Sequence, residues 1–260
     1  MKTLKLTIAY DGTRYAGWQI QKSSRQTAGG GRQKPTIQGT LERVLRRILQ
    51  EPVKVIGSGR TDAGVHALAQ VAHVRTSSAL SCHRLLRSLN QLLPPDLAVT
   101  RIEDAEESFH ARFRAKRKRY RYRLFTGLVV PPFIRRYVCH LREPVNVALM
   151  RREAESLRGC HDFSAFARTG SGRRSTTRTI SEIHVRRLGD EVLLETEGDG
   201  FLHTMVRSIA GTLVDVGRGR LPAGTVRRML STRQRRLAGA TAPANGLTLV
   251  SVTYARADDD

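Results

Sequence analysis

At 260 residues, 40% of them hydrophobic, the chain can bury a core, which argues against a disordered polypeptide and allows one large domain or two small ones. Its 45 Lys and Arg residues against 23 Asp and Glu give a formal net charge of +22, a balance typical of a nucleic-acid binder. The sequence also argues against a membrane protein, because no apolar run approaches the ~20 residues that span a bilayer.

The first half of the chain is predicted to mix strands and helices. Leu4, Leu6 and Ile8 alternate with polar residues, which indicates a half-buried strand. Thr36 is a suitable N-cap for a helix whose apolar residues share one face, and Pro52 ends that segment. We expect strands over 4–10, 53–56, 65–74 and 96–104, and helices over 37–49 and 81–94.

Residues 22–35, KSSRQTAGGGRQKP, contain no large apolar residue and are predicted to form a basic loop. Two roles stay open for this loop, an extension of a nucleic-acid-binding surface or an idle insertion. We favour a weak electrostatic contribution to binding.

The segment 112–123, RFRAKRKRYRYR, holds eight basic residues among twelve and is predicted to be a strand. Its arginines then lie on one face, and Tyr120 and Tyr122 lie on the other. Arginines that meet phosphates, beside a tyrosine on which a base stacks, are a usual way to hold single-stranded or looped RNA. We interpret Tyr122 as a core residue, whereas for Tyr120 a core role and a stacking role stay equally open.

The second half repeats the mixture, without strict alternation of strand and helix. We expect helices over 146–158, from about residue 201, and after Pro222, strands over 180–187, 191–197 and 246–255, and a Ser/Thr/Arg-rich loop over 167–179. His203 and Arg207 are predicted to share a helix face, either solvated or with Arg207 reaching a carboxylate or phosphate. The pattern predicts an α+β fold with a mixed, mostly antiparallel sheet flanked by helices. Two similar halves, 1–109 and 110–260, would flank a basic cleft.

Residues 57–66, GSGRTDAGVH, form a glycine-rich loop between two predicted strands. An arginine close to Asp62, such as Arg60, would keep the carboxylate ionised, which makes it a poor general base but a possible nucleophile. Hydrolysis of a glycosidic bond usually needs a second carboxylate, and the loop has none. The competing interpretation is that Asp62 caps a turn and pairs with Arg60.

Metal binding is not expected from this sequence. His66 and His73 lack cysteine or carboxylate partners at ligand spacing, so we interpret both as polar residues of a strand. The three cysteines are odd in number and widely spaced, which fits a reducing cytosol rather than a disulfide framework. We therefore expect a cytoplasmic protein without a bound metal ion.

Taken together, several segments resemble the tRNA pseudouridine synthase A (TruA) family, also called tRNA pseudouridine synthase I. They follow the family order, cover nearly the whole chain, and read YDGTRYAGWQ, TIQGTLE, GSGRTDAGVHALAQVAH, FHARFRAKRKRYRYRL, DFSAF, RTI, GDGFLHTMVRSIAGTLVDVG and GLTLVSV. GRTDAGVHA is the most diagnostic of them. The loop 22–35 is longer than expected between the GWQ and TIQ motifs.

The resemblance implies a cofactor-free homodimer that isomerises uridine to pseudouridine in the anticodon stem-loop, at tRNA positions 38, 39 and 40. It implies that Asp62 is the nucleophile, that Arg60 helps to flip the base, that Tyr120 stacks on it, and that Arg207 pairs with Asp62. We expect the tRNA to be contacted by Arg14, Arg60, His66, Arg114, Tyr120 and Arg121.

Isomerisation detaches uracil from C1′ and rejoins it through C5, so one carboxylate suffices and no water is consumed. Asp62 could attack C1′ of the sugar or C6 of the base, and Tyr120 could accept the C5 proton. The competing function is a non-catalytic RNA-binding protein, which would gain nothing from a carboxylate in an anion-binding cleft. The preferred uridine, and whether a dimer is needed for activity, stay open.

Overall fold

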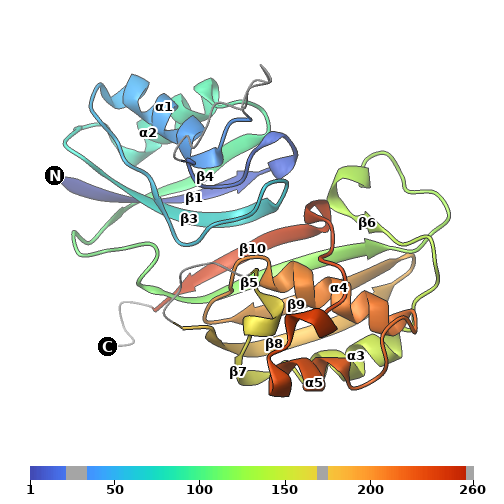
Figure 1. Ribbon diagram of the computed structural model, residues 1–260. Coiled ribbons are helices and arrows are strands. Elements are labelled where there is room, and N and C mark those ends of the chain that lie inside the picture. Colours follow the sequence, from blue (N-terminus) through green and yellow to red (C-terminus); the bar gives the residue numbers. More distant parts are fainter. Residues whose placement is uncertain (22–33, 169–174, 256–260) are drawn as a thin grey trace, which may run out of the picture. The chain divides into compact units, whose positions relative to one another are not determined.

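The structure is a computed structural model that describes residues 1–21, 34–168 and 175–255. The basic loop predicted over 22–35 therefore lies almost wholly outside the described residues, as does the middle of the loop predicted over 167–179. The chain divides into two compact units. One contains Met1–Ala115 together with the chain from Ser251 onward, and the other contains Lys116–Val250. Figure 1 labels the elements of both.

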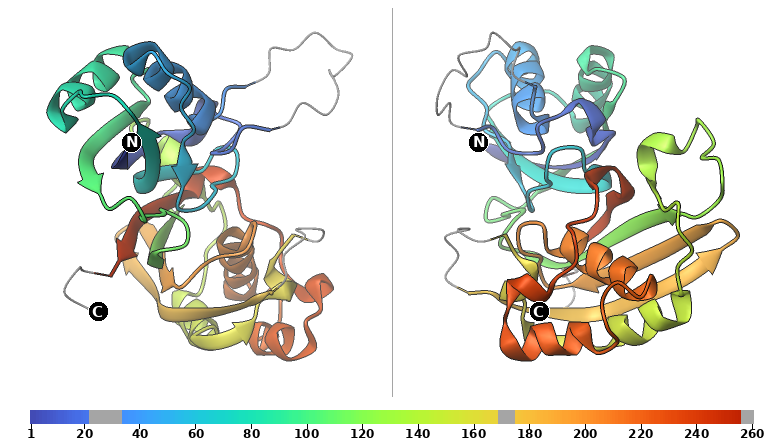
Figure 2. Two further views of the ribbon diagram at one scale, coloured as in Figure 1. Left: turned by 90° about the vertical axis from the view of Figure 1, so that its left-hand side faces the viewer. Right: turned by 45° about the vertical axis from the view of Figure 1, so that its right-hand side comes forward.

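The first unit is built on an antiparallel sheet in the order β4–β1–β3, with β2 paired to β3. Both helices of this unit lie over one face of the sheet (Figures 1 and 2). The predicted alternation is confirmed, because every second side chain of the first strand from Leu4 to Ile8 is fully buried. The elements are β1 (Lys2–Tyr10), α1 (Ile37–Leu49), β2 (Ile56–Gly57), β3 (His66–Thr76), α2 (Cys82–Leu92) and β4 (Leu97–Ala105).

The first helix begins where its capping residue predicts, because the Thr36 side chain accepts a hydrogen bond from the backbone N–H of Gly39. The structure shows a second cap of this kind at α2, where the Ser81 side chain accepts the backbone N–H of Arg84. Glu42 of α1 is buried and accepts a hydrogen bond from the backbone N–H of Val55 at 3.0 Å. This contact holds the segment before β2, where only Ile56 of the predicted strand 53–56 is in a strand.

The second unit has an antiparallel sheet in the order β5–β9–β8–β7, and β6 pairs with β5 in parallel. The sheet is therefore mixed and mostly antiparallel, as predicted, and α3 packs against β8 and α4. The predicted hairpin strands 180–187 and 191–197 are both confirmed. The elements are β5 (Ala115–Phe125), β6 (Cys139–His140), α3 (Val147–Glu155), β7 (Gly159–Asp162), β8 (Thr177–Leu188), β9 (Glu191–Gly198), α4 (Met205–Gly217), α5 (Thr225–Thr232) and β10 (Leu247–Tyr254).

The division into units differs in two ways from the predicted halves 1–109 and 110–260. It falls between Ala115 and Lys116, and β10 crosses from the second unit into the first. The reason is that the end of β10 packs on residues before β5. The hydroxyl of Tyr254 donates to the carbonyl of Ala111 at 2.7 Å, and the Tyr254 ring lies 5.2 Å from the ring of Phe109.

The helix predicted from about residue 201 begins at Met205, so the prediction that His203 and Arg207 share a helix face is wrong. His203 lies in a turn in which the backbone N–H of Met205 donates to the carbonyl of Leu202, and Thr204 has φ +62°. Leu202 has the spacing of the apolar residues of α4, and for this reason the sequence predicts that the helix begins near it. The side chain of Leu202 is indeed only 4% exposed, but the residue lies before the helix. Burial at helical spacing is not sufficient for a helix.

His73 of β3 makes the first unit sensitive to acid. It is 3% exposed, its Nδ1 accepts the backbone N–H of Ala111 at 3.1 Å, and burial, helped by His110 and Arg75, lowers its pKa from 6.5 to about 4. The unfolded chain therefore binds this proton first, and stability falls as the pH drops from 6.5 to 4. We expect a loss of up to ~3 kcal/mol from this group.

Chemical denaturation of the wild type and of His73→Asn across this pH range measures the loss. The asparagine carbonyl keeps an acceptor for Ala111 but does not titrate. We expect the variant to lose the corresponding part of the pH dependence. Equal slopes in the two proteins would contradict a depressed pKa for His73.

Candidate active site

The segment GSGRTDAGVH forms a loop between β2 and β3, as the sequence predicts. Its centre is a turn in which the backbone N–H of Val65 donates to the carbonyl of Asp62 at 3.2 Å. Gly64 has φ +79°, a conformation that glycine adopts without steric cost. The turn lifts Asp62 out of the strands, where it is half-buried.

The segment after β1 supports this loop from one side. The backbone N–H of Trp18 donates to the carbonyl of Thr61 at 3.0 Å, and the hydroxyls of Tyr10 and Thr61 lie 2.9 Å apart. Gly17 approaches so closely that a Cβ built on it would lie 2.6 Å from the Thr61 carbonyl oxygen. The backbone on either side of Asp62 is thereby fixed by residues more than forty positions earlier.

Gln70 of β3 supports the loop at its start. It is fully buried, accepts the hydroxyl of Ser58 at 2.6 Å and donates from Nε2 to the carbonyl of Gly59 at 3.2 Å. The sequence interpretation named neither Tyr10 nor Gln70 as part of the site. The sequence did contain a signal for Gln70. Its amide side chain lies among apolar residues of a predicted strand next to the loop, and a buried amide needs hydrogen-bond partners.

Gly17→Ala is expected to disturb the loop without unfolding the unit. A methyl group at this position meets backbone atoms of both Thr61 and Asp62, and φ is +96°. A displacement of about 1 Å at the reacting group can cost ~10²-fold in rate, and we expect a loss of kcat on tRNA of that order. Gly219→Ala is the matched control, because φ is +70° and no atom lies within 4 Å of the added carbon. It should lose ~1–2 kcal/mol of stability and no activity. Equal kcat values in the two variants would contradict the close support.

Arg60 is exposed, and within the described ranges it takes part in no ion pair. The interpretation in which Asp62 caps a turn and pairs with Arg60 stays a prediction. Arg60 is exposed, and Asp62, two residues later, is half-buried. Five donors held on an exposed loop suit contact with a phosphate or with an unstacked base.

Three of the other predicted contact residues in the first unit already hold protein partners. Arg14 binds Asp96 through both Nε and a terminal nitrogen, at 2.8 and 2.7 Å, and that hydrogen bond and charge raise the Arg14 pKa. Arg114 binds Glu106 at 2.6 Å. His66 is 3% exposed, and its Nδ1 accepts the backbone N–H of Gly12 at 3.1 Å and lies 3.2 Å from Oδ1 of Asp11.

In the second unit, Tyr120 and Tyr122 lie on one face of β5, and the arginines lie on the other. Tyr122 is fully buried, and its hydroxyl donates to the carbonyl of Pro243 at 2.7 Å, which confirms its interpretation as a core residue. Tyr120 is 8% exposed, and its ring packs edge-on against Phe201, with centroids 5.1 Å apart. Its ring is thus oriented by packing.

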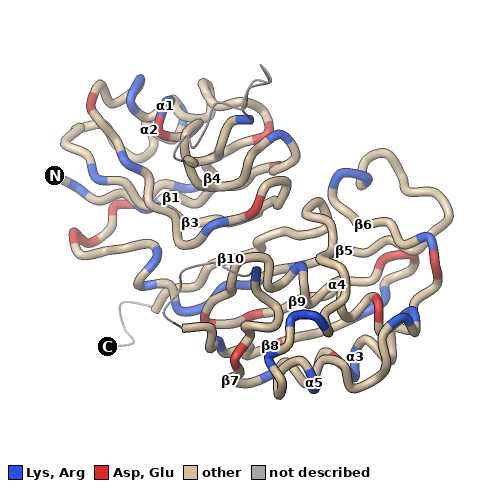
Figure 3. Tube along the Cα trace, viewed as in Figure 1, with Lys and Arg blue, Asp and Glu red and all other residues tan. Residues whose placement is uncertain are grey.

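The arginines of β5 pair with carboxylates of the neighbouring strand β9. Figure 3 marks the positions of the basic and acidic residues along the chain. Arg119 binds Glu197 at 2.9 Å, and Arg121 binds Glu195 at 2.8 Å, each opposite its partner in the ladder. Although burial opposes it, hydrogen bonds from Arg121 and Arg186 lower the Glu195 pKa. Cross-strand charge pairs of this kind stabilise a sheet. The composition of the segment 112–123 gave no sign of this, because the acids come some seventy residues later.

Arg207 is half-buried in the first turn of α4. Its Nε donates to the carbonyl of Ala242 at 2.8 Å, and the backbone N–H of Ala242 donates back to the carbonyl of Arg207 at 3.1 Å. The hydrogen bond from Nε restrains the guanidinium, and the backbone hydrogen bond joins the two segments. A fixed guanidinium presents its terminal nitrogens in the fork geometry that suits a carboxylate.

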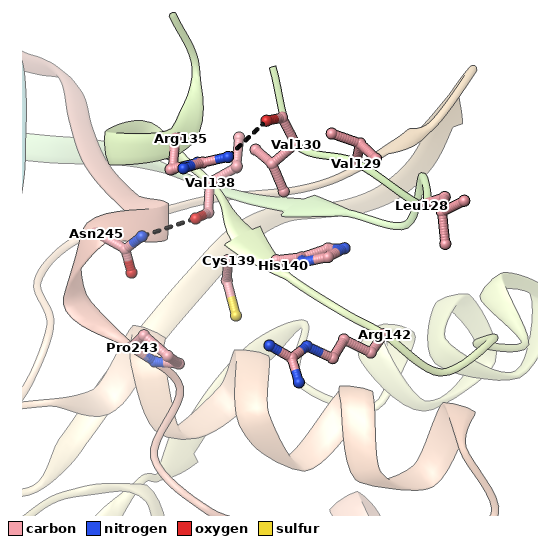
Figure 4. Close-up of a pocket in the computed structure, with 10 residues that line it drawn as sticks. All are labelled: Leu128, Val129, Val130, Arg135, Val138, Cys139, His140, Arg142, Pro243 and Asn245. Carbon is pink, nitrogen blue, oxygen red and sulfur yellow. Dashed lines mark hydrogen bonds between the residues drawn. The ribbon is translucent and has the colours of Figure 1, made fainter. Parts of the chain in front are cut away.

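A pocket of about 500 Å³ lies elsewhere in the second unit, between β6 and the segment around Pro243 (Figure 4). Its lining is apolar and basic, with Arg135 donating to the Val130 carbonyl at 3.4 Å. The pocket is not lined by Tyr120 or Arg207, and no carboxylate lines it. It therefore offers none of the chemistry expected for the site.

Comparison with known proteins decides the family. A model of the tRNA pseudouridine synthase family matches residues 6–114 and 154–255. The chain belongs to this family. It is accordingly an isomerase that acts on tRNA, and the resemblance inferred from its motifs is confirmed.

Curated relatives match along their whole length. The tRNA pseudouridine synthase A of an Exiguobacterium species is 41% identical over 258 residues, covering 99% of this chain and 100% of the relative. That of Moorella thermoacetica is 42% identical over 254 residues, covering 98% and 100%. Among solved structures, a chain in a Cbf5-Nop10-Gar1 complex has a TM-score of 0.37 and 13% identity. That match covers 95% of this chain and about half of the other, 48%.

Three further observations concern metal binding, membrane spanning and the two histidines of β3. No group of three or more His, Cys, Asp and Glu side chains within them could hold a metal ion. No helix that the structure describes is long and apolar enough to cross a membrane. Both histidines of β3 lie within that strand, as predicted.

Proposed function

We propose that the protein converts uridine to pseudouridine in the anticodon stem-loop of tRNA, at positions 38, 39 and 40, with Asp62 as the nucleophile. The observation that carries the proposal is the support of the Asp62 loop. Its backbone is held on one side by Gly17 and Trp18 and on the other by Gln70. A turn that only capped a strand would not need such support, whereas a nucleophile must be held in place.

The chemistry needs one carboxylate and no water. The C1′–N1 bond of the uridine breaks, the uracil turns, and a C1′–C5 bond forms, after which the C5 proton leaves. The carboxylate of Asp62 bonds covalently to C1′ or to C6 during this sequence and is released at the end, so it is regenerated. The target base must first leave its stack, which costs a few kcal/mol.

Other residues are proposed to hold the flipped uridine and the carboxylate. Arg60 is exposed and has no ion pair within the described residues, which supports its role in occupying the space that the base vacates. Tyr120, oriented by Phe201, would stack on the uracil and accept the C5 proton. Arg207, held by Ala242, would pair with Asp62 and keep it ionised.

The remaining tRNA contacts are proposed at Arg14, Arg114, Arg121 and His66. The three arginines share their donors with carboxylates, but each guanidinium has five N–H groups, and those of Arg14 and Arg114 are exposed. Their phosphate contacts would therefore be weaker than that of Arg60. His66 is buried and would act through the backbone of Gly12.

We propose further that the protein is a cytoplasmic homodimer. A tRNA substrate and three cysteines without a disulfide support the cytoplasm. Support for a dimer comes from Leu128, Val129 and Phe133, which lie close together in sequence and are 95%, 71% and 91% exposed. Sedimentation at working concentration tests the dimer, and a fully active monomer would refute it.

The deciding experiment uses unmodified tRNA that carries tritium at uridine C5. We expect the protein to release tritium, and to do so from tRNAs whose only labelled uridine is at position 38, 39 or 40. Tritium release only from uridines at other positions would show that the protein modifies those positions and not 38, 39 and 40. Tight binding with no release from any tRNA would favour the second candidate, a non-catalytic RNA-binding protein, which the net charge of +22 alone would also suit.

A further inference from the structure

An aromatic ring is exposed in the turn that precedes β5. Phe113 is 76% exposed, and it lies between two exposed arginines, Arg112 and Arg114. A phenylalanine in this position contributes little to folding, because most of its apolar surface stays in water. The turn 110–114 belongs to the first unit and lies outside the loop that carries Asp62.

Hydrogen bonds to the rest of the first unit hold the start of this turn at Ala111. Ala111 is fully buried, with its N–H bound to His73 and its carbonyl bound to the hydroxyl of Tyr254. The backbone N–H groups of Arg112 and Phe113 both donate to Nδ1 of His110, at 3.2 and 3.3 Å. The Phe113 ring therefore projects from a hydrogen-bonded turn.

The side chains around Phe113 order its ring while leaving it accessible. The His110 ring stacks on it, with centroids 4.2 Å apart and planes 29° apart. The guanidinium of Arg112 lies 5.7 Å from the ring centroid. With 76% of the residue exposed, these neighbours leave ring surface open to a further flat group.

The charge near this ring is positive. Arg112 is exposed and has no ion pair among the described residues, in contrast to Arg114, which binds Glu106. Cations beside an exposed aromatic ring complement an unpaired nucleotide, whose phosphate is anionic and whose base is flat.

We propose that Phe113 is a stacking platform for an unpaired base of the RNA substrate, with Arg112 contacting the adjacent phosphate. This binding site is separate from the flipped uridine, and it rests on the action of the protein on tRNA. A protein partner fits this surface less well than RNA does, because the ring is flanked by a cation and does not lie in an apolar groove. The experiments below distinguish the two partners, since only RNA binding should depend on stacking.

Tryptophan fluorescence tests the stacking directly. The only native tryptophan, Trp18, is 3% exposed and gives a constant background, so Phe113→Trp introduces one exposed reporter. Titration with a short single-stranded oligouridine should quench its emission saturably. The matched control is Leu188→Trp, placed at a 60% exposed position at the end of β8. Equal quenching in both variants, or none in Phe113→Trp at RNA concentrations that bind, would overturn the proposal.

Affinity for unmodified tRNA gives a second measurement. A stacked base contributes enough that Phe113→Ala should weaken binding ~5- to 150-fold, whereas Phe113→Tyr should retain affinity and Leu188→Ala should change nothing. Far-ultraviolet circular dichroism checks that each variant is folded. Unchanged affinity in Phe113→Ala would refute stacking and leave the ring to a protein partner. Tritium release by the wild type is measured separately, so the proposed reaction can stand if this site fails.

Discussion

Asp62→Asn is expected to lower tritium release from C5-labelled tRNA by at least about 10³-fold while tRNA binding stays intact. The amide has nearly the shape of the carboxylate, so the turn closed by the Val65 N–H should persist. It lacks the charge and nucleophilicity needed to form a covalent adduct. Removing one negative charge near tRNA phosphates should leave affinity equal or slightly higher.

Two further variants make the result decisive. Asp62→Ala guards against slow deamidation of the asparagine back to aspartate. Asp104→Asn is the matched control, because Asp104 is an exposed carboxylate of β4 in the same unit, and it should retain full activity. Substantial release by both Asp62 variants would exclude Asp62 as the nucleophile. Loss of tRNA binding together with release would make Asp62 a structural residue of the loop.

Tyr120→Phe is expected to lower tritium release by about 10²- to 10⁴-fold without weakening tRNA binding. The phenyl ring keeps the stacking surface and the edge-on contact with Phe201, but it cannot accept the C5 proton. Tyr120→Leu removes the stacking surface as well, so it should also weaken binding, by ~1–3 kcal/mol. Comparing the two variants separates the two roles proposed for one side chain.

Tyr122→Phe is the matched control for the loss of a hydroxyl from the same face of β5. It breaks the bond to the Pro243 carbonyl, so it should cost ~1 kcal/mol of stability and leave the rate of release unchanged. Full activity in Tyr120→Phe would assign the C5 proton to another group and leave stacking as the role of Tyr120. Equal losses in both tyrosine variants would indicate a general effect on the sheet.

The sequence alone determined much of the fold, because its strongest signals are local. Alternation from Leu4 to Ile8 predicts β1, and Thr36 marks the start of α1. These patterns depend on the repeat of a strand or a helix and on caps only three residues away. The motif order likewise identified the family, since each motif is a short continuous segment.

Within the site, local sequence predicted the loop but not its supports. The glycines and Asp62 of GSGRTDAGVH indicate a loop that approaches a ligand. That Gly17 packs on Thr61, and that Gln70 binds Ser58 and Gly59, depends on how β1 and β3 pair. A strand register is set by burial over the whole sheet, and a single strand does not carry it.

Other features were decided only by the tertiary structure. The arginines of β5 looked like a phosphate-binding face, yet Glu195 and Glu197 lie opposite them once β9 pairs with β5. Leu202 has helical spacing but is buried in a turn, so α4 begins at Met205. Tyr254 joins the first unit through Ala111, some 140 residues earlier. Contacts between distant segments depend on which surfaces the folded chain buries together, and a local pattern records only that a residue is buried, not against what.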